Sequence, residues 1–175
     1  MMRHWRLPRL CLGWRSFLVT FWLIVPPFSY AAESAKVEGN EFYMVTKVKG
    51  DFDEVVDNIT KEIKLQNFFV TGITDVDEGI QKRKGPGGKT AFEHYKIIGF
   101  CSLTLAEKAI SVDPNVGVFM PCRLLVYQLV GNADITIATM RPTFMAKVFR
   151  DPQVEALAKE VEQVVLKIFE AAEGF

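Results

Sequence analysis

Histidine is the scarcest of the chemically versatile residues in this chain. The 175 residues include His4 and His94 and no others, so a catalytic triad or an imidazole-based metal site would have to be built on one or two rings. No serine on a tight strand-to-helix turn marks a partner for His94. The sequence gives no support for Ser-His-Asp hydrolysis, and we expect a non-catalytic protein.

Two other common site motifs are incomplete. The Gly-Lys-Thr segment at residues 88–90 resembles the end of a phosphate-binding loop. Arg83 stands where that motif needs a glycine, and the segment has neither the strand before it nor the helix after it that the motif requires. The three acids between residues 75 and 78 lack the regular spacing of a calcium loop. We therefore predict no cofactor.

A long hydrophobic run is also missing. The longest apolar stretch covers residues 17–25, well short of the roughly 20 residues that a membrane-spanning helix needs. Four arginines and no acid precede it, and two prolines and small residues follow it. This order predicts a signal peptide over residues 1–31, cleaved after Ala31, which touches the membrane only transiently. The mature protein would be periplasmic or secreted; the alternative is an uncleaved anchor.

Cleavage changes the charge of the protein. The full chain has 21 basic and 21 acidic residues, and residues 1–31 carry four arginines and no acid, so the mature chain has a formal charge of −4. Scattered charges with this balance argue against a nucleic-acid partner. The 144 remaining residues suffice for one domain. We expect a flexible N-terminus over residues 32–40 and a single domain over residues 41–175.

Hydrophobic periodicity predicts the elements of that domain. Strands are expected where aromatic and β-branched residues gather, and helices where apolar residues recur every three to four positions. The predicted strands cover residues 41–49, 68–74, 94–101, 123–130 and 134–140, and the predicted helices cover residues 51–64, 104–110 and the segment from residue 152. A long polar loop is expected after the second strand.

This order of elements favours a particular fold class. The main elements run β-α-β-β-β-β-α, with the short helix inserted between the third and fourth strands. Short connections and a Gly131-Asn132 hairpin favour antiparallel pairing. Both main helices then cover one face of the sheet. The prediction is a two-layer α+β domain with a five-stranded antiparallel sheet.

The chain resembles a known family around its two central strands. The segment Gly99-Phe100-Cys101 and the run Val118-Phe-Met-Pro-Cys-Arg-Leu-Leu-Val-Tyr127 are similar to the cysteine-containing branch of the domain-of-unknown-function 302 family. That resemblance implies a TATA-binding-protein-like topology and a homodimer. The chain departs from the family pattern at residues 82–89, where a helix is common, and at Ser102-Leu103, where Asn-Pro often stands.

The cysteines Cys101 and Cys122 are the chemically distinctive residues of the mature chain. In an antiparallel pair, the end of the third predicted strand and the start of the fourth lie at the same edge, so we expect the two thiols to be near neighbours. They could form a structural disulfide or a redox or sulfur-handling pair assisted by Arg123. The third alternative is a soft-metal site made by Cys101, Met120 and Cys122, which we rank last.

Aromatic and methionine side chains suggest a second kind of site. A curved sheet under amphipathic helices can leave an apolar crevice, for which Phe100, Met120, Tyr127 and Met140 are the candidates. The sequence thus predicts an exported domain that binds an unknown small ligand or a protein partner, with the cysteine pair at one end of the sheet. The alternative is a periplasmic thiol-redox or sulfur-handling protein.

Overall fold

The computed structural model describes residues 36–174 of the chain. The predicted signal peptide and residues 32–35 of the predicted flexible segment lie outside this range. The described strands are β1 (Glu38–Gly39), β2 (Tyr43–Val48), β3 (Phe69–Asp75), β4 (Phe92–Cys101), β5 (Cys122–Leu129) and β6 (Ile135–Met140). The described helices are α1 (Phe52–Leu65), α2 (Val76–Lys84), α3 (Leu103–Val112), the 3-10 helix η1 (Pro114–Phe119), α4 (Pro142–Ala146) and α5 (Pro152–Ala172).

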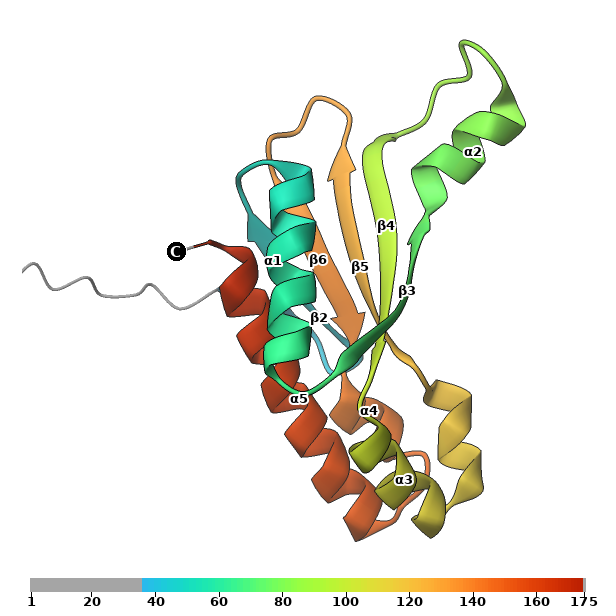
Figure 1. The fold of residues 1–175 in the computed structure, drawn as a ribbon, viewed down its shortest axis with the longest axis vertical. Coiled ribbons are helices and arrows are strands. Elements are labelled where there is room, and N and C mark those ends of the chain that lie inside the picture. Colours follow the sequence, from blue (N-terminus) through green and yellow to red (C-terminus); the bar gives the residue numbers. More distant parts are fainter. Residues whose placement is uncertain (1–35, 175) are drawn as a thin grey trace, which may run out of the picture. The chain divides into compact units, whose positions relative to one another are not determined.

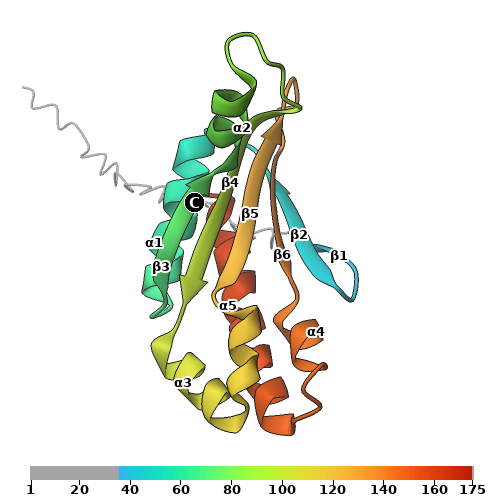
Figure 2. The ribbon, with the colours of Figure 1, turned by 90° about the vertical axis from the view of Figure 1, so that its right-hand side faces the viewer.

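The strands form one antiparallel sheet in the order β1-β2-β6-β5-β4-β3 (Figures 1 and 2). The hairpin between β5 and β6 contains Gly131 with a positive φ of 77°, a conformation that glycine adopts without steric cost. Because β4 and β5 are antiparallel neighbours, the end of β4 and the start of β5 lie at the same edge of the sheet. The fold class is α+β, as the sequence predicts.

Helices α1 and α5 cover one face of the sheet (Figure 1). Alternate strand residues point toward these helices, and each helix contributes an apolar stripe. Among the most completely buried of these side chains are Phe100, Phe169, Met44, Ile59, Ile63, Ile98, Leu124, Ile135, Ile137 and Ile168. This cluster, which we call the main core, contains 18 buried residues and lies entirely between positions 44 and 172.

Each long helix begins where its sequence predicts. The Asp51 carboxylate accepts hydrogen bonds from two backbone N–H groups of the first turn of α1, both at 3.0 Å. Asp151 does the same for α5, and Pro152 occupies its first helical position. Within residues 36–174, no helix is both long and apolar enough to cross a membrane.

A second, smaller cluster lies beyond the edge of the sheet where β4 ends and β5 begins (Figure 2). The helices α3, η1, α4 and the N-terminal half of α5 surround it. Its buried residues are Ala109, Val116, Ala146 and Val154. We call this group the helical cluster. These side chains are small, so they do not fill the space between the helices completely.

The structure corrects the sequence prediction in three places. The sheet has six strands, since residues 38–39 of the expected flexible segment pair with β2. Helix α2 lies within the expected polar loop; none of its side chains is buried, so hydrophobic periodicity gave no signal for it. The supposed departure from the family pattern after the second strand is therefore wrong. Residues 114–119, where the sequence predicts no helix, form η1.

Candidate functional site

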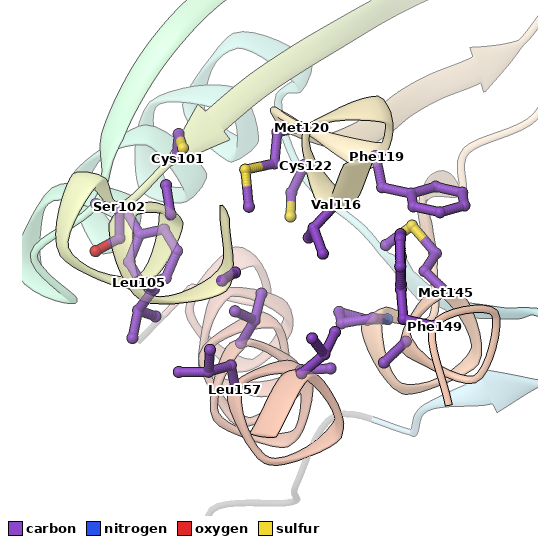
Figure 3. Close-up of a pocket in the computed structure, with 18 residues that line it drawn as sticks. Cys101, Ser102, Leu105, Val116, Phe119, Met120, Cys122, Met145, Phe149 and Leu157 are labelled. Carbon is purple, nitrogen blue, oxygen red and sulfur yellow. The ribbon is translucent and has the colours of Figure 1, made fainter. Parts of the chain in front are cut away.

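An apolar cavity of about 90 Å³ lies within the helical cluster (Figure 3). Four of the residues around it are Cys101, Ser102, Cys122 and Pro142. The remaining lining residues are Phe68, Leu105, Ala106, Ala109, Val116, Phe119, Met120, Met145, Ala146, Phe149, Val154, Leu157, Ala158 and Val161. Of the residues that the structure describes, none with a charged side chain lines this cavity.

The antiparallel pairing of β4 and β5 brings the two cysteines to the cavity wall. Phe100, the residue before Cys101, is the register partner of Cys122. After Cys101 the chain turns into α3, with Ser102 at its N-cap position, and it returns through η1 and a cis Met120–Pro121 peptide bond to begin β5. The long insertion therefore closes on itself, and both thiols line the same space.

Both cysteines are free thiols in the structure, so no disulfide joins them here. Burial raises the pKa of the Cys122 thiol to about 11, and the neighbouring Cys101 contributes further in the same direction. Burial also raises the pKa of Cys101, partly opposed by a hydrogen bond from the backbone of Ser102. Both groups are therefore protonated near neutral pH, whereas a nucleophilic or redox-active thiol needs a lowered pKa.

Arg123 does not assist the thiols in the way that the sequence suggested. Successive residues of a strand point to opposite faces, and Arg123 lies opposite Gly99 on the face of the sheet away from the main core. Cys122 points toward the core side. The redox interpretation thus lacks the positive neighbour on which it depended.

The four candidate crevice residues do not meet at one place. Phe100 is fully buried in the main core. Tyr127 and Met140 lie on the open face of the sheet, and only Met120 lines the cavity. The predicted crevice is therefore wrong as a group, because the strand register places Phe100 and Tyr127 on opposite faces.

The open face of the sheet carries a shallow groove of about 780 Å³. Tyr95 and Tyr127 stack across β4 and β5 with ring centroids 5.6 Å apart, and Phe92 packs edge-on against Tyr95. Leu125 and Met140 extend the apolar surface toward β6. In the described part of the chain, no helix covers this face (Figure 2), so a large aromatic surface faces solvent.

The acids between residues 75 and 78 lie at the far end of the sheet from the cavity (Figure 2). Asp75 forms a salt bridge with Lys96, and this hydrogen bond is the main reason why the pKa of Lys96 is raised. A carboxylate oxygen of Asp77 lies 3.9 Å from Nδ1 of His94, whose ring stacks on Phe52. No group of three or more His, Cys, Asp or Glu residues within positions 36–174 is arranged to hold a metal ion.

Sequence reasoning missed the residues that form most of the cavity. Leu105, Val116 and Leu157 line it from α3, η1 and α5, and Phe149 lines it from the turn between α4 and α5. Apolar spacing identified α3 and α5, yet nothing in a single sequence shows that these segments converge at one end of the sheet. The small residues Ala106, Ala109 and Ala158 were the available signal, since they leave room between helices.

Comparison with known proteins supports the fold and gives the family. No protein with a curated description matches the chain. The crystal structure of an uncharacterised conserved DUF302 protein from Bacillus stearothermophilus superposes with a TM-score of 0.67 at 23% sequence identity, covering 75% of this chain and 98% of that one. The family described as "Domain of unknown function DUF302" matches residues 44–172. This range includes β3 to β6 and all of β2 except Tyr43, and it excludes β1. The chain therefore belongs to the DUF302 family.

Proposed function

We propose that this protein is an exported, non-catalytic domain that binds a small uncharged ligand in the cavity of the helical cluster, with Cys101 and Cys122 in the wall. The observation that carries the proposal is the apolar lining of that cavity. Binding sites for small molecules are typically concave and mostly apolar, with a few polar groups that fix orientation. Here the hydroxyl of Ser102 and the two thiols are the polar groups.

The size of the cavity limits the ligand. Pockets for drug-sized molecules enclose roughly 300–1,000 Å³, whereas this cavity has about 90 Å³. An engineered protein cavity of about 150 Å³ lined by apolar side chains binds benzene. The proposed ligand is therefore a molecule of a few heavy atoms, or one end of a longer apolar chain.

Benzene titration tests this proposal with a matched pair of variants on one helix. Ala158 lines the cavity, whereas Ala156 is exposed on the same helix two positions earlier. Wild-type protein and Ala156→Leu should bind benzene, seen as perturbed methyl NMR signals of cavity residues. Ala158→Leu fills the space and should abolish these perturbations. Absence of binding by the wild type at saturating benzene would reject the proposal.

The thiol-redox alternative has less support. A reversible redox pair needs at least one exposed thiol with a lowered pKa, and burial raises the pKa of both Cys101 and Cys122. Rapid exchange of the folded protein with oxidised glutathione at neutral pH, at a rate above that of a free cysteine, would restore this alternative.

Export is supported by the sequence pattern of residues 1–31 together with the position of the core. The buried residues of the main core and of the helical cluster lie between positions 44 and 172, and Val37 packs against the main core, so cleavage after Ala31 would leave both intact. The intact mass of the protein recovered from cells tests this directly. A mature chain should begin at Ala32, and an unprocessed chain in the cytosolic fraction would contradict the proposal.

A second copy of the chain is the partner that we propose for the open face of the sheet. Two apolar sheet faces can pack against each other about 10 Å apart, and a two-fold dimer joins identical surfaces. Tyr127→Arg should convert a dimer to a monomer in sedimentation equilibrium, whereas Val148→Arg, at an exposed site elsewhere, should not. A monomeric wild type at high concentration would refute the dimer.

A further inference from the structure

Three of the four sulfur-containing side chains around the cavity lie on one side of it, and the fourth, Met145, lies beside Phe149 (Figure 3). Cys101, Met120 and Cys122 gather where β4 ends and β5 begins, away from Phe149 and Leu157 on the other side (Figure 3). Phe100, the residue before Cys101, is the register partner of Cys122, so the two cysteines stand on neighbouring strands within one residue of each other. Two thiols and a thioether therefore face a common space that is too small for a typical organic cofactor.

We propose that Cys101, Met120 and Cys122 form a binding site for a single Cu(I) ion. This inference goes beyond the proposed binding of a small organic ligand and does not depend on it. It rests on the convergence of three sulfur side chains in one small cavity.

The donor set selects the metal. Soft thiolate and thioether ligands favour Cu(I), whereas magnesium, calcium and manganese require oxygen ligands. Zinc sites are almost always completed by four thiolate, imidazole or carboxylate ligands. The cavity has two cysteines, and no histidine, aspartate or glutamate from the described chain lines it. A zinc ion would thus lack half of its usual ligands.

The apolar surroundings favour a monovalent ion with few ligands. Cu(I) bound by one thiolate is electrically neutral, so it enters the cavity without an unpaired buried charge. The ion replaces the proton of that thiol, which is released to solvent, and a sulfur–copper bond replaces the sulfur–hydrogen bond. No electron is transferred in this step. The second cysteine keeps its proton and binds through a sulfur lone pair, as the Met120 thioether does, so one proton is released and the complex stays neutral.

Competition for Cu(I) tests the site directly. Fully reduced protein, free of added thiols, is titrated anaerobically with Cu(I) against a chromophoric Cu(I) chelator. The wild type should bind one equivalent, with ultraviolet sulfur-to-copper charge-transfer absorption. Cys101→Ala and Cys122→Ala should each weaken binding by at least about 100-fold, and Met120→Leu by roughly tenfold, because a thioether is a weaker ligand than a thiolate. Met140→Leu, on the open face, should have no effect.

Circular dichroism and a thermal melt of each variant separate lost ligands from lost folding, and Met120→Leu nearly conserves volume. X-ray absorption of the copper-loaded wild type should show sulfur scatterers alone around the ion. Binding that survives in both cysteine variants, nitrogen or oxygen scatterers, or no competition with the chelator would overturn the proposal. A wild type that binds no benzene but binds one equivalent of Cu(I) would reject the ligand proposal and leave the copper site standing, so the two proposals fail separately.

Discussion

The two hydrophobic clusters of this domain differ in how completely they are filled. The main core between the sheet and helices α1 and α5 contains 18 buried residues, among them large side chains such as Phe100 and Phe169. The helical cluster has four, of which two are alanines. Long elements with continuous apolar stripes bring large side chains together, whereas short helices that meet end to side leave space between them.

This difference in packing assigns stability mainly to the main core and ligand binding to the helical cluster. Dense packing contributes most of the favourable free energy of folding, since each large buried side chain adds roughly 1.5–3 kcal/mol. A loosely packed region contributes less and can accept a ligand without disrupting the sheet. The proposed site lies in the helical cluster, where incomplete packing costs the fold least. The cysteines lie at the boundary between this cluster and the main core.

Removing one large aromatic side chain from each cluster tests this contrast most strongly. Phe169→Ala in the main core should lower the free energy of unfolding by about 3–5 kcal/mol, because the fully packed surroundings cannot collapse into the space. Phe149→Ala in the cavity wall should cost less than half as much, since that ring is only partly buried. Urea unfolding of both variants measures the two values. Equal losses would mean that the helical cluster is as tightly packed as the main core.

The free energy of unfolding should depend on pH in the alkaline range, because the Cys122 thiol is buried in the folded protein. The pKa of Cys122 is raised from 9.0 to about 11 in the folded protein. Between these values the unfolded chain loses the thiol proton while the folded chain keeps it. Stability from this group is therefore complete below pH 9 and falls by up to about 1.4 kcal/mol per pH unit as the pH rises toward 11.

Comparison of two proteins isolates this effect from other groups that titrate in the same range. The difference in unfolding free energy between wild type and Cys122→Ala should shrink as the pH rises from 9 to 11. Val116→Ala, in the same cavity wall but without a titratable group, should show a constant difference from wild type. A pH-independent difference for Cys122→Ala would mean that the thiol is not buried.

The contrast between the clusters also explains what the sequence could predict. The main core depends on local periodicity, so strands and helices such as α1 and α5 were identified from their own residues. The proximity of Cys101 and Cys122 followed from one rule about antiparallel neighbours. These features are encoded within single elements or within one pair of adjacent strands.

Features that depend on register or convergence could not be predicted in this way. The candidate crevice failed because Phe100 and Tyr127 are on opposite faces, and their relative orientation is fixed only by the pairing of Phe100 with Cys122. Helix α2 has no buried face to reveal it. The cavity lies between two pairs of helices, α3 with η1 and α4 with α5, and these pairs are separated in the sequence by β5 and β6. No local sequence pattern therefore marks its lining.

The smallest expected effect concerns the ion pair that fixes α4 against α5. The Glu162 carboxylate accepts a hydrogen bond from Arg141 at 2.6 Å and another from the hydroxyl of Thr143 at 2.5 Å. Glu162→Gln removes the charge and one acceptor oxygen at nearly constant volume. It should lower the unfolding free energy by about 1 kcal/mol, because the group is partly buried and its partners lose a charged acceptor.

The location of the effect matters more than its size. Hydrogen exchange of the backbone amides of α4 should accelerate in Glu162→Gln, while the amides of β4 and β5 in the main core stay protected. Glu78→Gln provides the control, since its pair with Lys82 is exposed on α2 and should change stability by only a few tenths of a kcal/mol. Faster exchange in the sheet as well would show that the two clusters unfold together, and that the cavity wall does not open independently of the main core.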